Sequence, residues 1–199
     1  MRLILVRHGQ TNDNVRRVMQ GEQGAPLNDE GWEQARRVAE RFSQTPIDML
    51  VASPIERAMQ TAMTIARNHG HLHPIPMALL RERSAGETTG LSYEEFGALS
   101  VADSGGHTGF RPRGGESLRD VGRRASFWHE AMMRQWHGQT IMAVTHGGWL
   151  RAYLSWLKHG VVDTRSWKYK HDNTGVSLVD LSGTRPVVKL LNDISHLTA

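Results

Sequence analysis

The chain has 199 residues, of which 39% are hydrophobic and 22% are charged, and its formal net charge at pH 7 is +4. These proportions are those of an ordinary globular protein, so they exclude a chain that is mostly disordered or mostly embedded in a membrane. The absence of cysteine excludes disulfide bonds, a thiolate nucleophile and zinc or iron–sulfur sites with cysteine ligands.

The sequence predicts one domain over residues 1–199, because no Pro-, Gly- or Ser-rich linker divides it. The apolar run near the start, Leu3 to Val6, is too short for a signal peptide or a transmembrane helix. We therefore expect a soluble, cytoplasmic protein without a membrane partner. The arginines are scattered along the chain, whereas a nucleic-acid binder more often groups them in one run, so we expect no nucleic-acid partner; scattered arginines suit both capture of small phosphates and ordinary surface solubility. The sequence indicates no particular oligomeric state.

The first part of the chain predicts two strands with a helix between them. The run Leu3 to Val6 is apolar without alternation, which is typical of a strand buried on both faces. Asn28 is a suitable N-cap, and the apolar residues that follow it at helical spacing are Ala35, Val38, Ala39 and Phe42. A second apolar run, Met49 to Ala52, predicts the next strand.

The rest of the chain continues this alternation of strands and helices. Ser53, followed by a proline, predicts the N-cap of a second helix. Residues 100–114 are rich in Gly, Ser and Arg and predict a loop. Ser117 and Asp120 resemble a capping box before a long third helix, and Ile141 to Val144 predict another strand. The fold class is therefore α/β: a three-layer sandwich with a mostly parallel central sheet flanked by helices.

Polar side chains follow the predicted strands, at His8, Ser53 and His146. Ligands of open α/β sheets bind outside the carboxyl ends of the strands, so these side chains should converge. Glycine follows each histidine, and Gly147 would let a ligand approach the backbone closely. Arg57 lies in the first turn of the helix expected after Ser53, where the helix dipole and unpaired N–H groups favour an anion. The pattern predicts a phosphate site.

Arg7 precedes His8 and could offer a second guanidinium to the same anion. Strand alternation would point these two neighbouring side chains to opposite faces of the sheet. A bend at Gly9 would have to resolve that conflict.

Motifs around these residues occur in a fixed order along nearly the whole chain. They are Leu5-Val6-Arg7-His8-Gly9-Gln10-Thr11 with Asn14, Gln20-Gly21, Pro26-Leu27-Asn28, Ser53-Pro54-Ile55-Glu56-Arg57-Ala58, Leu80-Arg81-Glu82-Arg83 with Gly86 and Gly90, Gly114-Gly115-Glu116-Ser117, and Thr145-His146-Gly147-Gly148. Together they resemble the histidine phosphatase superfamily, which includes phosphoglycerate mutase. The resemblance implies a phosphoglycerate mutase-like fold.

The resemblance also implies a mechanism and a role for each motif residue. His8 would attack phosphorus in line to give a phosphohistidine, which water then hydrolyses. Glu82 would serve as general acid and then as general base, while Arg7, Arg57 and His146 would bind the phosphate oxygens. The candidates for further substrate contacts are Asn14, Gln20, Gly21 and Gly147; the first three could instead be turn residues.

Three functions remain open at this level. The first is a phosphomonoesterase, a histidine acid phosphatase-type hydrolase of a small phosphorylated metabolite. The second is a cofactor-dependent phosphoglycerate mutase, but Ala85 and Tyr93 stand where the mutase pattern has tyrosine and lysine. The third is a phosphate-binding regulatory module without turnover, which the presence of every motif residue disfavours. Arg111 and Arg113 could bind a second acidic group of the substrate, or they could simply solvate a mobile segment.

The sequence predicts neither a metal site nor a cofactor. His69, His71 and His73 lie close together but lack a carboxylate or cysteine at a familiar spacing, which favours a solvated loop over metal binding. Neither a Walker loop nor a dinucleotide-binding glycine motif is present.

Overall fold

The computed structural model describes residues 1–198, so residue 199, the last of the predicted domain, lies outside the described residues. Within them, six strands form a sheet in the order β3-β2-β4-β1-β5-β6. Their bounds are Arg2–Arg7 (β1), Met49–Ala52 (β2), Ile75–Pro76 (β3), Thr140–Thr145 (β4), Val176–Asp180 (β5) and Val187–Asp193 (β6). β1 to β4 are parallel to one another, whereas β5 pairs antiparallel with both β1 and β6. The predicted mostly parallel sheet is confirmed, and its three predicted strands are β1, β2 and β4.

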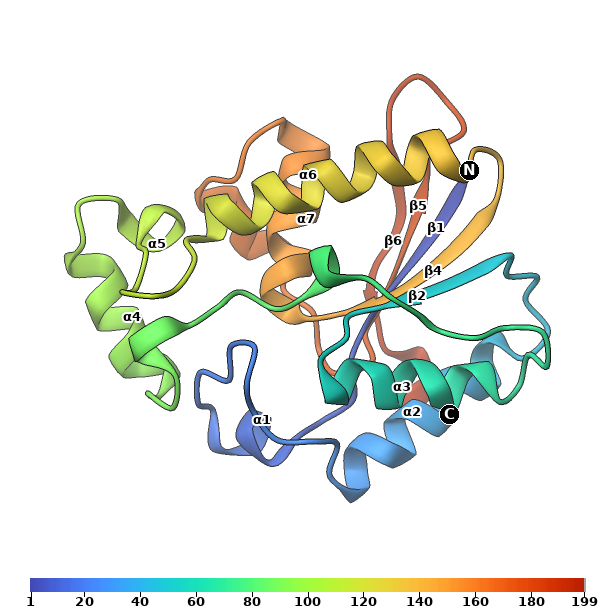
Figure 1. Cartoon of the computed structure of the whole chain (residues 1–199), viewed down its shortest axis with the longest axis horizontal. Coiled ribbons are helices and arrows are strands. Elements are labelled where there is room, and N and C mark those ends of the chain that lie inside the picture. Colours follow the sequence, from blue (N-terminus) through green and yellow to red (C-terminus); the bar gives the residue numbers. More distant parts are fainter. Residues whose placement is uncertain (199) are drawn as a thin grey trace.

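Alternate residues of β1 and β4 face opposite sides of the sheet, and each side has its own apolar core. One core contains Leu3, Leu5, Ile141 and Ala143 with helices α6 (Leu118–Gln135) and α7 (Gly147–His159). The other contains Ile4, Val6, Met142 and Val144 with helices α2 (Asp29–Phe42) and α3 (Glu56–Ala66). Burial on both faces explains the apolar runs without alternation. Figure 1 shows the resulting helix–sheet–helix layers, as predicted.

Helix starts agree with the sequence at two places and differ at a third. Asn28 caps α2 by accepting a hydrogen bond from the backbone N–H of Gly31, and Ser117 and Asp120 form the expected capping box of α6. The predicted N-cap at Ser53 is wrong, because α3 begins at Glu56. The Ser53 hydroxyl is instead engaged in the site described below.

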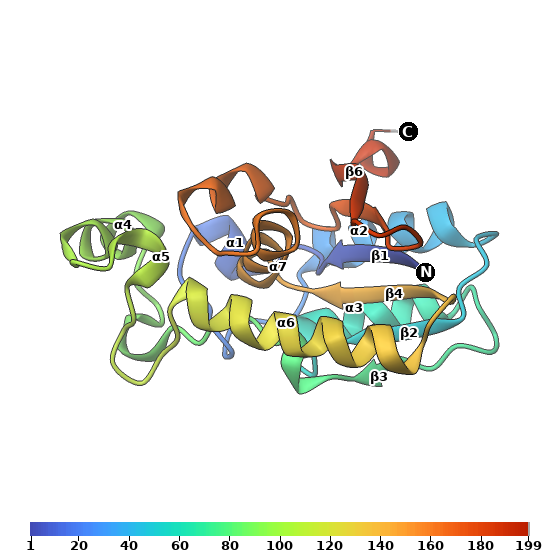
Figure 2. The ribbon, with the colours of Figure 1, turned by 90° about the horizontal axis from the view of Figure 1, so that it is seen from above.

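Smaller elements cover the carboxyl ends of the parallel strands. They are α1 (Asn12–Arg16), η1 (Ala78–Leu80), η2 (Gly86–Thr88), α4 (Tyr93–Ala102), α5 (Gly106–Gly109) and η3 (Thr164–Tyr169), while η4 (Ser195–Leu197) packs near α2. Figure 2 shows α4 and α5 beyond the end of the sheet toward which β1 and β4 point.

The predicted loop over residues 100–114 is partly wrong. A capping box of Ser92 and Glu95 starts α4, which continues through Ala102, and the single turn of α5 follows. Only the remainder of this segment is irregular. Among residues 1–198, no helix combines the length and the apolar character that crossing a membrane requires.

Candidate active site

His8 directly follows β1, and only 2% of the residue is exposed. Its Nδ1 atom lies 2.7 Å from the carbonyl oxygen of Gly9. A carbonyl oxygen only accepts hydrogen bonds, so Nδ1 carries the proton of the neutral ring and Nε2 carries the lone pair. Burial, with the positive charges of Arg57 and Arg7, holds the pKa of His8 well below its usual value. The ring therefore offers a neutral lone pair at Nε2.

Arg57 lies in the first turn of α3 and directs its guanidinium at His8. Its Nε–H group donates a hydrogen bond to Nε2 of His8 at 3.3 Å, a donor that an incoming phosphate oxygen could accept instead. Its Nη1 and Nη2 atoms donate hydrogen bonds to the carbonyl oxygens of Gln23 and Gly21, each at 2.8 Å. Burial lowers the pKa of Arg57 to about 10, so the guanidinium stays charged at neutral pH. Two carbonyl groups thus fix a buried cation beside the nitrogen lone pair.

His146 follows β4, and its ring centroid lies 5.1 Å from that of His8. Its Nε2 atom lies 2.8 Å from the hydroxyl oxygen of Ser53, which also accepts a hydrogen bond from the backbone N–H of Ile55. The hydroxyl proton can then be donated to Nε2, which places the ring proton on Nδ1. Burial, followed by the charge of Arg57, lowers the pKa of His146. Nδ1 is buried without a partner among the described residues, so it is available to donate to an anion.

Arg7 is the last residue of β1, and its side chain lines a cavity at the end of the sheet. Its Nη1 atom donates to the carbonyl oxygen of His171 at 2.7 Å. A Cβ added at Gly147 would lie 3.4 Å from Nε of Arg7, so this glycine lies against the guanidinium. After burial and Arg57, the charge of Arg7 also lowers the pKa of His8, so the two side chains interact although they are neighbours in the chain.

Glu82 lies between η1 and η2 and points its carboxylate into the same cavity. One oxygen, Oε1, accepts a hydrogen bond from the backbone N–H of Arg83 at 2.8 Å, and Oε2 accepts one from Gly148 at 3.1 Å. A Cβ at Gly148 would lie only 2.3 Å from Oε1, so a side chain at this position would displace the carboxylate. Burial lowers the pKa values of Arg7 and Arg57, and the negative charge of Glu82 opposes this lowering for both cations.

The segment that contains Glu82 is held against α6. Arg124 of α6 donates to the carbonyl oxygen of Glu82 at 2.9 Å and forms a 2.9 Å ion pair with Glu116. Glu116 in turn accepts a hydrogen bond from the backbone N–H of Ser84 at 3.0 Å. A Cβ at Gly115 would lie 2.8 Å from the carbonyl oxygen of Ser84. The Gly-Gly-Glu-Ser motif therefore positions Glu82 rather than lining the cavity.

Of the other residues predicted to contact the substrate, two line the cavity and one does not. Asn14 and Gly21 both line the cavity, and the side-chain oxygen of Asn14 accepts a hydrogen bond from Asn173 at 3.1 Å. Gln20 does not line the cavity. Its side-chain oxygen accepts a hydrogen bond from the Thr11 hydroxyl at 3.1 Å, so it supports the loop around the site.

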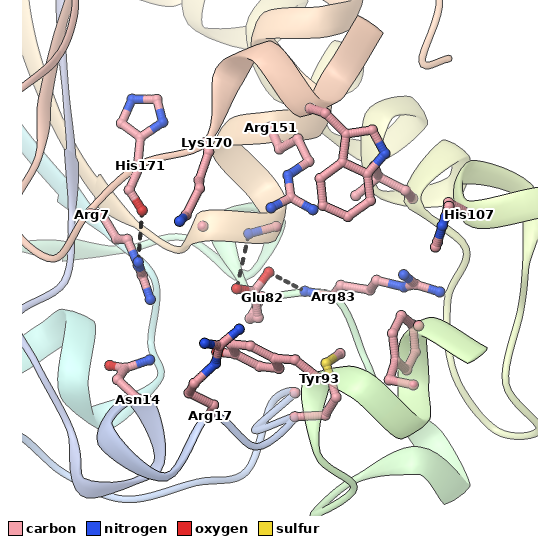
Figure 3. A pocket seen from close by; sticks show the side chains of 18 of the residues that line it. Arg7, Asn14, Arg17, Glu82, Arg83, Tyr93, His107, Arg151, Lys170 and His171 are labelled. Atoms are coloured by element: carbon pink, nitrogen blue, oxygen red, sulfur yellow. Dashed lines mark hydrogen bonds between the residues drawn. The ribbon is translucent and has the colours of Figure 1, made fainter. Parts of the chain in front are cut away.

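The cavity has a volume of about 660 Å³ and extends from Glu82 to the underside of α4 and α5. Several of its lining side chains were not predicted; they are Arg17, Arg83, Tyr93, Arg151, Trp167 and Lys170. Figure 3 shows that the labelled residues among them surround Glu82 from several elements. A signal existed for Arg151, which follows Gly147 by four residues and therefore shares its face of α7. No comparable pattern marks Arg17 or Lys170.

Arg111 and Arg113 do not line the cavity. Arg111 is exposed and forms a 2.6 Å ion pair with Asp120, and the backbone of Arg113 packs against Gly86. Their predicted contact with a second acidic group of the substrate therefore lacks support. Among residues 1–198, no group of three His, Asp or Glu side chains is arranged to hold a metal ion. His71 instead contacts the carbonyl oxygen of Ile47 at 3.2 Å.

Comparison with known proteins gives the family. The model of the histidine phosphatase superfamily (branch 1) matches residues 3–194. Phosphoglycerate mutase-like protein 4 of Arabidopsis thaliana is 34% identical over 98% of this chain and 86% of its own length. The metal-independent phosphoserine phosphatase of the same plant is 31% identical over 99% of this chain and 83% of its own. A mutant phosphoserine phosphatase from Entamoeba histolytica, crystallised with phosphoserine, aligns over 98% of both chains with a TM-score of 0.88 and 27% identity. This chain belongs to the histidine phosphatase superfamily.

Proposed function

We propose that this protein is a phosphomonoesterase that hydrolyses a small phosphorylated metabolite through a phosphohistidine on His8. The observation that carries the proposal is the neutral Nε2 of His8, held 3.3 Å from Nε of the buried Arg57. A phosphate ester is an anion, so the adjacent cation offsets the charge that would otherwise repel a nucleophile.

In the first step, Nε2 of His8 bonds to phosphorus as the bond from phosphorus to the alcohol oxygen breaks. Arg57, Arg7 and Nδ1 of His146 donate hydrogen bonds to the nonbridging oxygens, where negative charge must be stabilised. Protonated Glu82 gives its proton to the departing oxygen, so the alcohol leaves neutral.

In the second step, the Glu82 carboxylate takes a proton from a water molecule. The water oxygen bonds to phosphorus as the bond from phosphorus to Nε2 of His8 breaks. The products are the alcohol and hydrogen phosphate, and both His8 and Glu82 return to their starting protonation states. Asn14, Gly21 and Gly147 complete the proposed substrate contacts, and Gln20 acts indirectly by holding the loop near Thr11.

The relatives support hydrolysis of a small phosphate ester over the alternatives. One of them is named a phosphoserine phosphatase, and the Entamoeba structure contains phosphoserine. Another is named mutase-like, so return of the phosphoryl group to the substrate remains the second candidate. The organisation of residues 1–199 as one domain and the cytoplasmic location stay predictions from the sequence.

A panel of phosphate esters tests the proposal. We expect free phosphate from several esters, including 4-nitrophenyl phosphate, and loss of that release in His8→Ala. The panel includes 3-phosphoglycerate with and without 2,3-bisphosphoglycerate, and the isomer composition is measured with free phosphate. Isomerisation without phosphate release would favour the mutase. Phosphate binding without turnover would favour the regulatory module, and full activity of His8→Ala would reject His8 as nucleophile.

A further inference from the structure

The outer part of the cavity contains three cations that the proposed chemistry does not use: Arg17, Arg151 and Lys170. They come from three separate places in the chain, namely the end of α1, the second turn of α7 and the residue after η3. Among residues 1–198, no carboxylate lies within 4.0 Å of their nitrogens. Their charge is therefore not neutralised by a neighbouring ion pair.

These cations face the same space as Glu82. In Figure 3, the side chains of Lys170 and Arg151 lie on one side of Glu82 and that of Arg17 lies on the other. The guanidinium carbon of Arg151 lies 4.0 Å from the ring centroid of Trp167, which fixes its orientation without neutralising its charge. Nε of Arg151 is buried without a hydrogen-bond partner among the described residues.

Among the described residues that line the cavity, two carry a carboxylate, Glu82 and Asp172. Both oxygens of Glu82 already accept backbone hydrogen bonds, from Arg83 and Gly148. One oxygen of Asp172 accepts a hydrogen bond from the side chain of Asn192 at 2.9 Å. A ligand ammonium would thus meet few acceptors and several cations, whereas a ligand anion would meet donors without strong partners.

We propose that the outer cavity binds a second anionic group on the alcohol part of the substrate and discriminates against an ammonium group there. This inference rests on the proposed phosphatase function, because the first phosphate must occupy the site at His8. The substrate class is then a phosphomonoester whose alcohol part carries either a carboxylate or a second phosphate and carries no amine. The inference thereby separates this chain from an enzyme specialised for phosphoserine. At about 660 Å³, the cavity also has room for an alcohol larger than glycerate.

A matched set of small esters isolates the two charges. 3-Phospho-D-glycerate carries the carboxylate, and sn-glycerol 3-phosphate replaces it with a neutral hydroxymethyl group. Both enantiomers of O-phosphoserine keep the carboxylate and carry an ammonium in place of the hydroxyl group on C2. Dissociation constants are measured by calorimetry with His8→Ala, which makes the readout independent of turnover. We expect phosphoglycerate to bind about tenfold or more tightly than glycerol phosphate, from one charge-assisted hydrogen bond. We expect each phosphoserine enantiomer to bind about tenfold more weakly than phosphoglycerate.

Variants of the exposed cations connect the preference to the residues. In the His8→Ala background, Arg17→Gln and Lys170→Gln together should reduce the ratio of phosphoglycerate to glycerol phosphate affinity by about tenfold. Each of the two substitutions is also tested singly, and Arg111→Gln is the control matched to Arg17→Gln, because it removes one charge from an arginine outside the cavity. It should leave the ratio unchanged. Arg151→Gln extends the test if circular dichroism shows a folded protein.

Several outcomes would overturn the inference. They are equal or tighter binding of either phosphoserine enantiomer, an unchanged ratio in the Arg17 and Lys170 variant, the same change in Arg111→Gln, and binding of none of the four esters. Each of these leaves the proposed function standing if the native protein still releases phosphate from other esters. The absence of hydrolysis across the whole panel would instead reject the phosphatase itself.

Discussion

Replacing Gly148 with alanine should disable Glu82 while leaving the fold intact. A Cβ at this position would lie 2.3 Å from Oε1 of Glu82. An ordinary carbon contact is about 3.5 Å, so the carboxylate must move by about 1 Å. A displacement of this size in a catalytic group costs about a hundredfold in rate. We therefore expect kcat/KM for an alkyl phosphate, which reports the step in which the alcohol leaves, to fall about a hundredfold in Gly148→Ala.

The leaving group distinguishes loss of the general acid from a general disturbance of the site. Nitrophenolate departs readily without a proton, whereas an alkoxide does not, so the loss in kcat/KM should be far smaller for 4-nitrophenyl phosphate than for an alkyl ester. Gly147→Ala serves as the comparison, because its Cβ would lie 3.4 Å from Arg7 and does not touch Glu82. Any loss in Gly147→Ala should be similar for both types of ester.

Thermal unfolding completes this test. Both glycines lie in the first turn of α7, where alanine gains up to about 1 kcal/mol of helix propensity. The melting temperature of Gly148→Ala should therefore not fall markedly. Wild-type kcat/KM for alkyl esters in Gly148→Ala, or equal losses in kcat/KM for both leaving groups, would refute the assignment of Glu82 as the general acid.

Other predictions concern the histidines and their partners. Arg57→Lys should lower kcat/KM about 10²- to 10³-fold, because lysine keeps the charge but not the planar fork beside His8; activity near wild type would contradict this. Ser53→Ala should lower kcat about tenfold by releasing the His146 ring, and steady-state kinetics measure it. Because the pKa of His8 lies well below 6.5, kcat/KM should show no loss from His8 protonation between about pH 8 and pH 6.5. In Arg57→Gln the pKa of His8 should rise, because a nearby positive charge is removed, so the fall in kcat/KM caused by protonation of His8 should begin at a higher pH. Burial lowers the pKa of His171 to about 4 from 6.5, so the unfolded chain binds the proton first as pH falls through this window. His171 alone should therefore lower the free energy of unfolding by about 1.4 kcal/mol per pH unit in this window, measured as the difference between the native protein and His171→Asn in urea unfolding.

The residues that sequence reasoning located most directly are those attached to regular elements. His8 and His146 could be placed because the carboxyl ends of parallel strands share one edge of a sheet, and Arg57 because a helix begins nearby. Glu82 lies between two short 3₁₀ turns, where no periodicity exists, so only the family resemblance pointed to it. Lys170 reaches the cavity only through the packing of η3 against α7, a tertiary contact that no local pattern records.

For the fold, as for the site, the sequence predicts the regular buried elements but not those whose position depends on tertiary contacts. The buried strands β1, β2 and β4 have unbroken apolar runs, whereas β6 alternates exposed and half-buried residues at the edge of the sheet and was not predicted. The N-cap at Ser53 failed for a reason specific to this site. Its hydroxyl contacts His146, 93 positions away, so a local capping rule was overridden by a long-range hydrogen bond.

The hydrogen-bond partners of Arg7 and Arg57 explain why these two side chains are fixed in position while their positive charge is not neutralised by an ion pair. Arg7 and Arg57 donate to the carbonyl oxygens of His171, Gln23 and Gly21, and neither forms an ion pair within the described residues. A carbonyl dipole satisfies an N–H group but carries no net charge, whereas a paired carboxylate would cancel the guanidinium and compete with phosphate. Burial then disfavours both cations, and it lowers both of their pKa values. A bound phosphate dianion would offset the unfavourable burial of the two positive charges. The arrangement that destabilises the free protein therefore favours binding of the phosphorylated substrate.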